Sequence, residues 1–294
     1  MRQLFLSIVF MCGLAMWCPA QESTPLRLVF YNMEWFPGGS PRATIPEAVT
    51  AMHKMIPVLE ALRPDIIGAT EMSSAEALDV ALARVPGVLT QVCSAFTMGD
   101  GTPTIQQIAI ASKLPAASAW WEGWSVSKAA PPRGFAFAAY EPSPGSVLLV
   151  YTVHLKSNRG DLPANIAMRE ESARQLLDHV RAMEKAYASM GHVAVVIGGD
   201  FNSSLDDPKF AEEKTLTMFK KAGFDWSWAD VPFEQRVTLP SSPSMNPRFP
   251  PFPDACFDHA FVKGAKILSA SVYTPETDPS DHRPIIIEID LVKK

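Results

Sequence analysis

One stretch near the middle of the chain constrains its fold more than any other. Residues 193–197 form an apolar, mostly β-branched run, which is followed by two glycines, by Asp200 and, two residues later, by Asn202. Such a run is typical of a strand that is buried on both faces. In an extended backbone the side chains of Asp200 and Asn202 face the same side. The stretch is thus either a strand that presents a ligand pair at its end or ordinary turn chemistry, and the rest of the chain must decide between them.

The composition is that of an ordinary globular protein. Of the 294 residues, 47% are hydrophobic and 19% are charged, which is ample material for a core. The net charge of -5 lacks the basic footprint of a general nucleic-acid binder, although it leaves room for a nuclease in which a metal ion meets the phosphate. No internal repeat and no linker divides the sequence, so we expect one domain over residues 21–294.

Residues 1–20 have the order of a signal peptide. Arg2 precedes an apolar run over residues 4–17, and Ala20 supplies the small residue before a polar stretch. The run is shorter than the ~20 residues that span a membrane, so we expect cleavage after Ala20 and no stable membrane span afterwards. The mature protein would then be secreted or periplasmic, with a retained anchor as the alternative. Export would allow Cys93 and Cys256 to form a disulfide, with two separate buried thiols as the alternative.

The periodicity of the apolar residues predicts alternating strands and helices, with a group of closely spaced strands between them. A helix over residues 46–62 contains Pro57, which should kink or split it. In the long helix over residues 163–191, Arg169 is expected to face water. Residues 88–140 are predicted to form a meander of antiparallel strands. The other expected strands are 26–32, 65–71, 147–154, 257–262, 267–273 and 284–291, and the other expected helices are 74–85 and 211–222.

Polar side chains stand at the ends of the expected strands. Asp200 and Asn202 share this position with residues from five other places in the chain, and so many polar strand ends are hard to explain as turns. These other residues are Asn32 with Glu34, Glu71, His154, Asp258, and the pair Asp281 and His282 in the loop before the last strand.

At these positions the sequence resembles the endonuclease/exonuclease/phosphatase superfamily, whose members include deoxyribonuclease I-like and exonuclease III-like enzymes. The resemblance implies an α+β fold, namely a four-layered αββα sandwich in which helices flank two mixed, mainly antiparallel sheets. It also implies a catalytic domain that cleaves phosphoester bonds with the help of a metal ion. The motifs that carry it occur in the family's order: Tyr31-Asn32-Met33-Glu34, Pro64-Asp65-Ile66-Ile67 leading to Glu71, Val153-His154-Leu155-Lys156-Ser157, Gly199-Asp200-Phe201-Asn202, Phe257-Asp258-His259 and Ser280-Asp281-His282-Arg283-Pro284.

The resemblance implies roles for these residues that agree with their chemistry. A hard cation, Mg²⁺ or Mn²⁺, prefers oxygen ligands, and Glu71 is the first candidate ligand, with Asn32 and Asp281 to complete its shell. His282 is the candidate base for the attacking water, because an imidazole titrates near neutral pH. The resemblance assigns Asp258 to orient this imidazole.

The same resemblance implies roles for three further residues, Asp200, Asn202 and His154. Asp200 and Asn202 would hold the attacking water and a phosphate oxygen, or a second metal ion. His154 would donate to a non-bridging phosphate oxygen or stabilise the leaving group. The candidate catalytic residues are thus His154, Asp200, Asn202, Asp258 and His282, and the candidate metal ligands are Glu71, Asn32, Asp281, Asp200 and Asn202.

Several other residues allow both a functional and a structural interpretation, and the structural one is preferred. Glu34 and Arg133 are expected to be surface residues rather than a metal ligand and a phosphate contact. The side chain of His259 should point away from the face that Asp258 uses, and we expect it to be structural. An aromatic cluster could stack bases or lie at a lipid interface, but packing between the sheets is favoured. This cluster consists of Trp120, Trp121 and Trp124.

Three hypotheses for the function remain. The first is an exported, monomeric phosphodiesterase that depends on a divalent metal, with a nuclease as the first candidate. The second keeps this chemistry but acts on a phospholipid or a small phosphoester, in the manner of a sphingomyelinase or an inositol-phosphate phosphatase, and the acidic composition slightly favours it. The third is a catalytically inactive binding protein, against which the complete set of site residues argues. The loops 36–45, 97–104, 155–164 and 231–256 match no recognisable specificity signature, so the substrate stays open.

Overall fold

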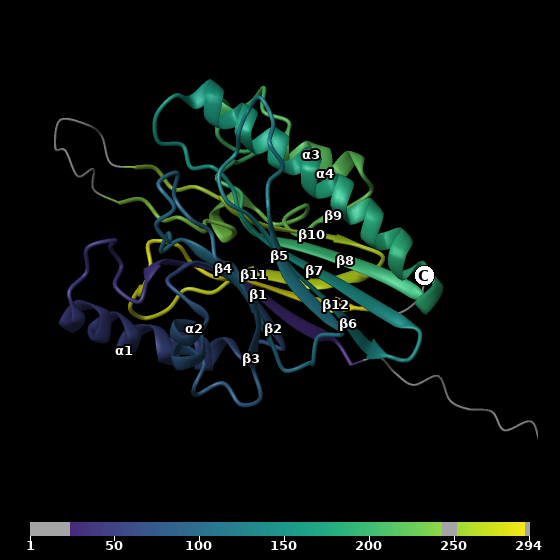
Figure 1. Cartoon of the computed structure of the whole chain (residues 1–294), viewed down its shortest axis with the longest axis horizontal. Coiled ribbons are helices and arrows are strands. Elements are labelled where there is room, and N and C mark those ends of the chain that lie inside the picture. The colour runs from purple at the N-terminus through teal and green to yellow at the C-terminus, as the bar shows by residue number, and fades with distance from the viewer. Residues whose placement is uncertain (1–23, 243–251, 292–294) are drawn as a thin grey trace, which may run out of the picture.

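The computed structural model describes residues 24–242 and 252–291; the predicted signal peptide and part of the loop 231–256 lie outside them. Within the described residues two sheets pack face to face, and helices cover the outer face of each sheet (Figure 1). This is the predicted four-layered αββα sandwich, and the expected fold is confirmed. The helices are α1 (Ile45–Leu62) and α2 (Ala75–Ala81) on one side and α3 (Leu162–Tyr187) and α4 (Thr215–Lys221) on the other.

The first sheet is built from both ends of the chain. Its strands in the described residues are β1 (Leu26–Phe36), β2 (Ile66–Met72), β3 (Leu89–Cys93), β4 (Gln107–Ser112), β11 (Lys266–Val272) and β12 (Ile285–Asp290). They lie in the order β11-β12-β1-β2-β4-β3. Only the β1–β2 pair among them is parallel, so the sheet is mixed and mainly antiparallel.

The second sheet comes from the middle of the chain and contains the strand that ends in Asp200. Its strands in the described residues are β5 (Ser118–Gly123), β6 (Gly134–Ser143), β7 (Ser146–His154), β8 (His192–Asp200), β9 (Asp225–Trp226) and β10 (Asp258–Lys263). They lie in the order β5-β6-β7-β8-β10-β9. The long helix α3 connects β7 to β8, which are parallel as such a crossover allows.

Two apolar cores hold the four layers together. The larger core fills the space between the sheets, continues beneath α3 and α4, and includes Leu28 and Phe30 of β1, whereas Val29 and Tyr31 of the same strand belong to the core beneath α1 and α2. This alternation follows from the two-residue period of a strand. The ring of Phe30 lies so close to β8 that a Cβ added to Gly198 would be 2.4 Å from it. Gly198 is therefore required for the close approach of the two sheets.

The helix α1 continues through Pro57, so the expected split does not occur. Its N-terminus carries a capping box in which the Glu47 carboxylate accepts a hydrogen bond from the backbone N–H of Thr44 at 2.7 Å. Pro57 lies on the exposed side of the helix. The carbonyl that proline leaves without an N–H partner can therefore be hydrated there, which makes the proline tolerable.

Two expectations about the elements need correction. The strands predicted as one meander over residues 88–140 are divided, because β3 and β4 belong to the first sheet and β5 and β6 to the second. Pro115 lies in the connection between β4 and β5, and a proline cannot donate to a strand ladder. The helices expected over 163–191 and 211–222 are shorter than expected: α3 is followed by a 3₁₀ turn over Ala188–Met190, and α4 spans Thr215–Lys221.

The cysteines and the tryptophans have structural roles. Cys93 and Cys256 are two separate free thiols, as in the second alternative, but only Cys256 is buried and Cys93 is half-buried. The tryptophans pack against other aromatic rings, but not between the sheets as expected: Trp120 lies 4.3 Å from the ring of Phe137 and 6.0 Å from that of His179 in α3, and Trp124 contacts Phe135. Trp121 contacts Phe96 and is exposed. In the described part of the chain, no helix has the length and apolar character that crossing a membrane requires.

Candidate active site

Three adjacent strands of the second sheet bring polar residues into one row. In the strand register His154 at the end of β7 lies beside Asp200 at the end of β8, and Asp200 lies beside Asp258 at the start of β10. Paired residues on neighbouring strands project from the same face, so the three side chains converge. Gly199 has φ +132°, and a Cβ there would lie 2.1 Å from the carbonyl oxygen of Val153. Only glycine is therefore compatible with this strand end.

His282 reaches this row from the loop before β12. Its Nδ1 is 2.7 Å from Asp258 Oδ2, and its Nε2 is 3.9 Å from Asp200 Oδ2. The loop is anchored to β1, because Ser280 Oγ donates to the carbonyl oxygen of Asn32 at 2.7 Å and accepts the backbone N–H of His282 at 3.1 Å. Burial lowers the pKa of His282, but the charges of Asp258 and Asp200 and the hydrogen bond to Asp258 raise it well above its usual value.

Glu71 and Asn32 approach the row from the first sheet. Asn32 Nδ2 donates to Asp200 Oδ2 at 3.0 Å and to Glu71 Oε1 at 3.3 Å, so one amide links carboxylates from both sheets. His154 Nε2 lies 3.4 Å from the same oxygen of Glu71 and 3.5 Å from Asp200 Oδ2. Burial, followed by the charge of Arg133, holds the pKa of His154 well below its usual value, so its ring is neutral.

Asp200 is the common contact of the site. Asn202 donates to it twice, from its backbone N to Oδ1 at 2.8 Å and from its Nδ2 to Oδ2 at 2.9 Å. The backbone of Asn202 has φ +51°, which lets the chain turn back toward Asp200. Burial raises the pKa of Asp200 to about 7; the charge of His282 opposes this rise and that of Asp258 adds to it. Burial likewise raises the pKa of Glu71.

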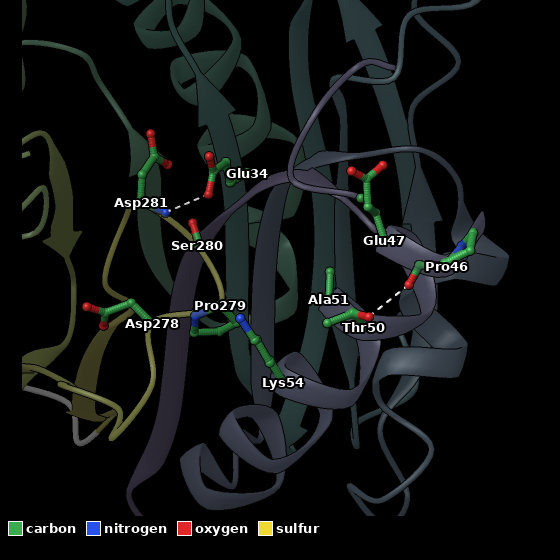
Figure 2. Close-up of a pocket in the computed structure, with 11 residues that line it drawn as sticks. Glu34, Pro46, Glu47, Thr50, Ala51, Lys54, Asp278, Pro279, Ser280 and Asp281 are labelled. Atoms are coloured by element: carbon green, nitrogen blue, oxygen red, sulfur yellow. Dashed lines mark hydrogen bonds between the residues drawn. The ribbon is translucent and has the colours of Figure 1, made fainter. Parts of the chain in front are cut away.

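Asp281 and Glu34 form the outer rim of the site. The side chain of Asp281 is exposed, and its backbone N–H donates to Glu34 Oε2 at 2.9 Å (Figure 2). Glu34 is thus half-buried and bound to a neighbouring loop, whereas a free surface carboxylate was expected. Burial, then the charge of Asp281, raises its pKa to about 7. The spacing of Asn32 and Glu34, two residues apart at a strand end, was the signal for this position.

Two arginines also differ from expectation. Arg133 donates from Nε to the carbonyl oxygen of His154 at 3.0 Å and from Nη2 to that of Leu155 at 2.8 Å, so it holds the end of β7 and is not a free surface arginine. The antiparallel pairing of β6 with β7 explains this contact of Arg133, because it places the start of β6 beside the end of β7. Arg169 is fully buried rather than facing water, and it forms a bidentate ion pair with Glu213 at 2.8 and 2.6 Å.

The buried arginine is connected to the site. Arg169 Nη1 donates to the carbonyl oxygen of Lys156 at 2.9 Å and to Asn158 Oδ1 at 3.0 Å, and Asn158 Nδ2 donates to the carbonyl oxygen of Asn202 at 2.9 Å. This chain of hydrogen bonds fixes the loop after β7 against the residue that follows β8. The sequence placed Arg169 outside the apolar stripe of its helix, which is why solvent exposure was predicted.

The residues of the site fit a divalent cation. Asp200, Asp258 and His282 offer ligand atoms that lie within 4.8 Å of one another. Asp258 Oδ1 is buried and has no hydrogen-bond partner. Burial raises the pKa of Asp200 and of Glu71, because a carboxylate without solvent is costly to keep charged. A bound cation would offset this cost. A donor set made mainly of carboxylate oxygens suits a hard cation.

The sequence match to a protein family agrees with this geometry. Residues 29–282 match the sequence model of the Endonuclease/Exonuclease/phosphatase family, and the chain belongs to this family. Its family membership and its Asp/His cluster make it a hydrolase of the metal-dependent type that acts on phosphoester bonds, as the sequence predicted.

Solved structures share the fold at low sequence identity. The catalytic domain of human Nocturnin is 13% identical with a TM-score of 0.66, over 90% of this chain and 93% of that one. An endonuclease/exonuclease/phosphatase from Beutenbergia cavernae is 17% identical with a TM-score of 0.61, over 90% and 71%. A mannosyl-6-phosphatase from Bacteroides thetaiotaomicron is 16% identical with a TM-score of 0.59, over 90% and 99%. A comparison with curated protein sequences finds no match.

Proposed function

We propose that this protein is an exported phosphodiesterase that hydrolyses its substrate with Mg²⁺ or Mn²⁺ and a water molecule activated by His282. The observation that carries the proposal is the position of the His282 ring between two buried carboxylates, with Nδ1 at 2.7 Å from Asp258 and Nε2 facing Asp200. An imidazole held through one nitrogen by a carboxylate presents its other nitrogen to the reacting water.

Glu71 and Asn32, with Asp281 at the rim, would hold the cation, and Asp200, which the Asn32 amide links to Glu71, would contribute to the same shell. The cation, when bound, polarises a phosphoryl oxygen and neutralises part of the carboxylate charge that raises the pKa of His282. His282 accepts the proton of the attacking water through Nε2, and Asp258 stabilises the imidazolium that forms. His154 is neutral, so its Nε2–H can donate to a non-bridging phosphate oxygen.

Export rests on the signal-peptide order of residues 1–20. Fractionation of cells that express the full chain would test it: we expect a mature protein that begins at Gln21 outside the cytoplasm. Recovery of the uncleaved chain in the cytoplasm would contradict it.

The catalytic proposal is tested with the purified chain from residue 21 onward. Plasmid DNA, RNA and small phosphoesters are incubated with Mg²⁺ or Mn²⁺, and His282→Ala should lower the rate about 10²- to 10⁴-fold, as loss of a general base does. His53→Ala removes an exposed histidine of α1 and is the matched control. Unchanged activity of His282→Ala would refute the assignment of the base.

Nucleic acid is the first substrate that this panel should include, as the sequence predicted. A small organic phosphoester is the second candidate, and it is favoured by an acidic cavity beside the site, which is lined by Glu34, Asp278 and Asp281. Hydrolysis of DNA or RNA alone would support the first candidate, and hydrolysis of small esters alone would support the second.

A further inference from the structure

A cavity of about 560 Å³ lies beside the catalytic residues, between the first turns of α1 and the loop before β12 (Figure 2). Its walls come from three segments that are far apart in the sequence: the end of β1, one face of α1, and residues 278–281. The charged side chains that line it are those of Glu34, Glu47, Lys54, Asp278 and Asp281.

The cavity shares a wall with the catalytic site. Ser280 lines the cavity, and its hydroxyl also holds the backbone of His282 and of Asn32. Glu34 lines it too and binds the backbone N–H of Asp281. The cavity therefore adjoins the loop that carries His282, on the side of Glu34 and Asp281.

The charge of the cavity is negative on balance, although Glu34, with its pKa of about 7, is only partly ionised at neutral pH. Four carboxylates and one ammonium group, that of Lys54, line it. One of the four, Asp278, also lies 3.9 Å from Arg283 Nε, so its charge is partly compensated. The loop on the other side of His154 has the opposite sign, with Lys156 and Arg159.

The carboxylates of the cavity do not converge on one point. In residues 24–242 and 252–291, only Asp200, Asp258 and His282 bring three ligand atoms within 4.8 Å of one another. The carboxylates of the cavity are spread along its walls instead. Such a spacing suits an extended organic group that can donate several hydrogen bonds, rather than a bare ion.

We propose that this cavity binds the organic group of a phosphoester substrate and selects groups that carry an ammonium charge. The inference rests on the proposed phosphoesterase function and narrows its substrate class. A polynucleotide carries phosphates on both sides of the scissile bond, so one of them would enter the acidic cavity and be repelled over the Debye length of about 8 Å. An alkylammonium group instead donates to the carboxylates on the walls.

The test compares two esters that differ by one charge. The 4-nitrophenyl ester of 2-aminoethyl phosphate carries an ammonium where the 4-nitrophenyl ester of propyl phosphate carries a methyl group, and both release the same phenolate. With Mg²⁺ at low salt, we expect kcat/KM to be higher for the aminoethyl ester by about fivefold or more. The preference should decrease as salt is added.

Three variants locate the effect. Asp278→Asn should reduce the preference for the aminoethyl ester, and Lys54→Gln should increase it, because the two substitutions change the charge of the cavity in opposite directions. Glu141→Gln neutralises an exposed carboxylate on β6 outside the cavity and should leave the preference unchanged. Equal rates for the two esters, or a preference that ignores Asp278→Asn and Lys54→Gln, would overturn the inference.

Binding separates this inference from the proposed activity. If neither the two esters nor DNA or RNA is hydrolysed, the proposed function fails, and calorimetry of 2-aminoethyl phosphate and propyl phosphate with the metal-loaded protein still measures the selectivity. Tighter binding of 2-aminoethyl phosphate that is weakened by Asp278→Asn would support the inference. Equal binding of the two, or efficient hydrolysis of DNA with no preference between the esters, would refute it.

Discussion

Acidification should destabilise the protein through His259. This side chain is fully buried, and both ring nitrogens have partners: Nδ1 accepts from Trp226 Nε1 at 3.2 Å and lies 3.9 Å from Cys256 Sγ, and Nε2 lies 2.9 Å from the carbonyl oxygen of Ser203. Only the neutral ring with its proton on Nε2 satisfies both contacts, because a second proton on Nδ1 would face the N–H of Trp226. Burial is the main cause that lowers the pKa of His259 to about 4.

Proton linkage determines the direction and the size of this change in the free energy of unfolding. Above the ordinary pKa of 6.5, His259 is neutral in both the folded and the unfolded protein, and its contribution is constant. As the pH falls from 6.5 toward 4, the unfolded chain binds a proton that the folded chain does not, so the free energy of unfolding decreases. The difference of 6.5 − 4 = 2.5 pKa units corresponds to a loss of about 3 kcal/mol.

Urea unfolding of the metal-free protein measures this loss. His259→Gln is the control, because a glutamine can also offer one acceptor and one donor but does not titrate. The free energy of unfolding should fall more steeply for the natural protein than for this variant, by about 2–3 kcal/mol between about pH 7.5 and about pH 4.5. Other groups, such as Asp200 with its raised pKa, affect both proteins alike and cancel in the difference. Parallel pH profiles would refute the reasoning.

Three further outcomes are expected. Glu71→Gln should weaken Mn²⁺ binding in calorimetry by about tenfold or more while the chain stays folded, since a buried carboxylate ligand is lost; unchanged affinity would remove Glu71 from the ligand set. Arg169→Ala should lower the free energy of unfolding by about 3–5 kcal/mol because it leaves a buried carboxylate unpaired. By contrast, Arg174→Ala, which breaks exposed pairs, should cost less than about 1 kcal/mol, and equal costs would contradict the burial argument. Gly199→Ala should destabilise the chain strongly in the same denaturation assay. Gly99→Ala should not, because a Cβ at Gly99 meets no atom within 4 Å. A stable Gly199→Ala protein would show that β7 and β8 can separate.

The fold could be predicted because local patterns and motif order agree. The apolar run that ends in Asp200 is a buried strand, and the strands before and after it carry their polar residues at the expected ends. His154 and Asp258 meet Asp200 through strand register. Each of these placements needs only the position of a residue within its strand, which the two-residue period of side chains provides.

The rest depends on contacts between distant segments, which no local pattern contains. Arg169 lies on a helix among polar neighbours and is nevertheless buried, because Glu213, 44 residues later, neutralises it. Glu34 belongs to the site because the loop of Asp281, 247 residues later, folds against it. The division of the expected meander has the same origin, since the choice of sheet is made by the packing of the layers.

The catalytic row of His154, Asp200 and Asp258 and the cavity that would select the substrate are held by different parts of the fold, which matters for engineering. The distances between these side chains are set by the backbone ladder of β7, β8 and β10, whose strands lie about 4.8 Å apart. The acidic cavity is bounded instead by α1 and the loop before β12. Residues of the cavity on α1 can therefore be exchanged, and its substrates altered, while the backbone hydrogen bonds of the ladder preserve the spacing of His154, Asp200 and Asp258; Ser280, which also holds His282, must be kept.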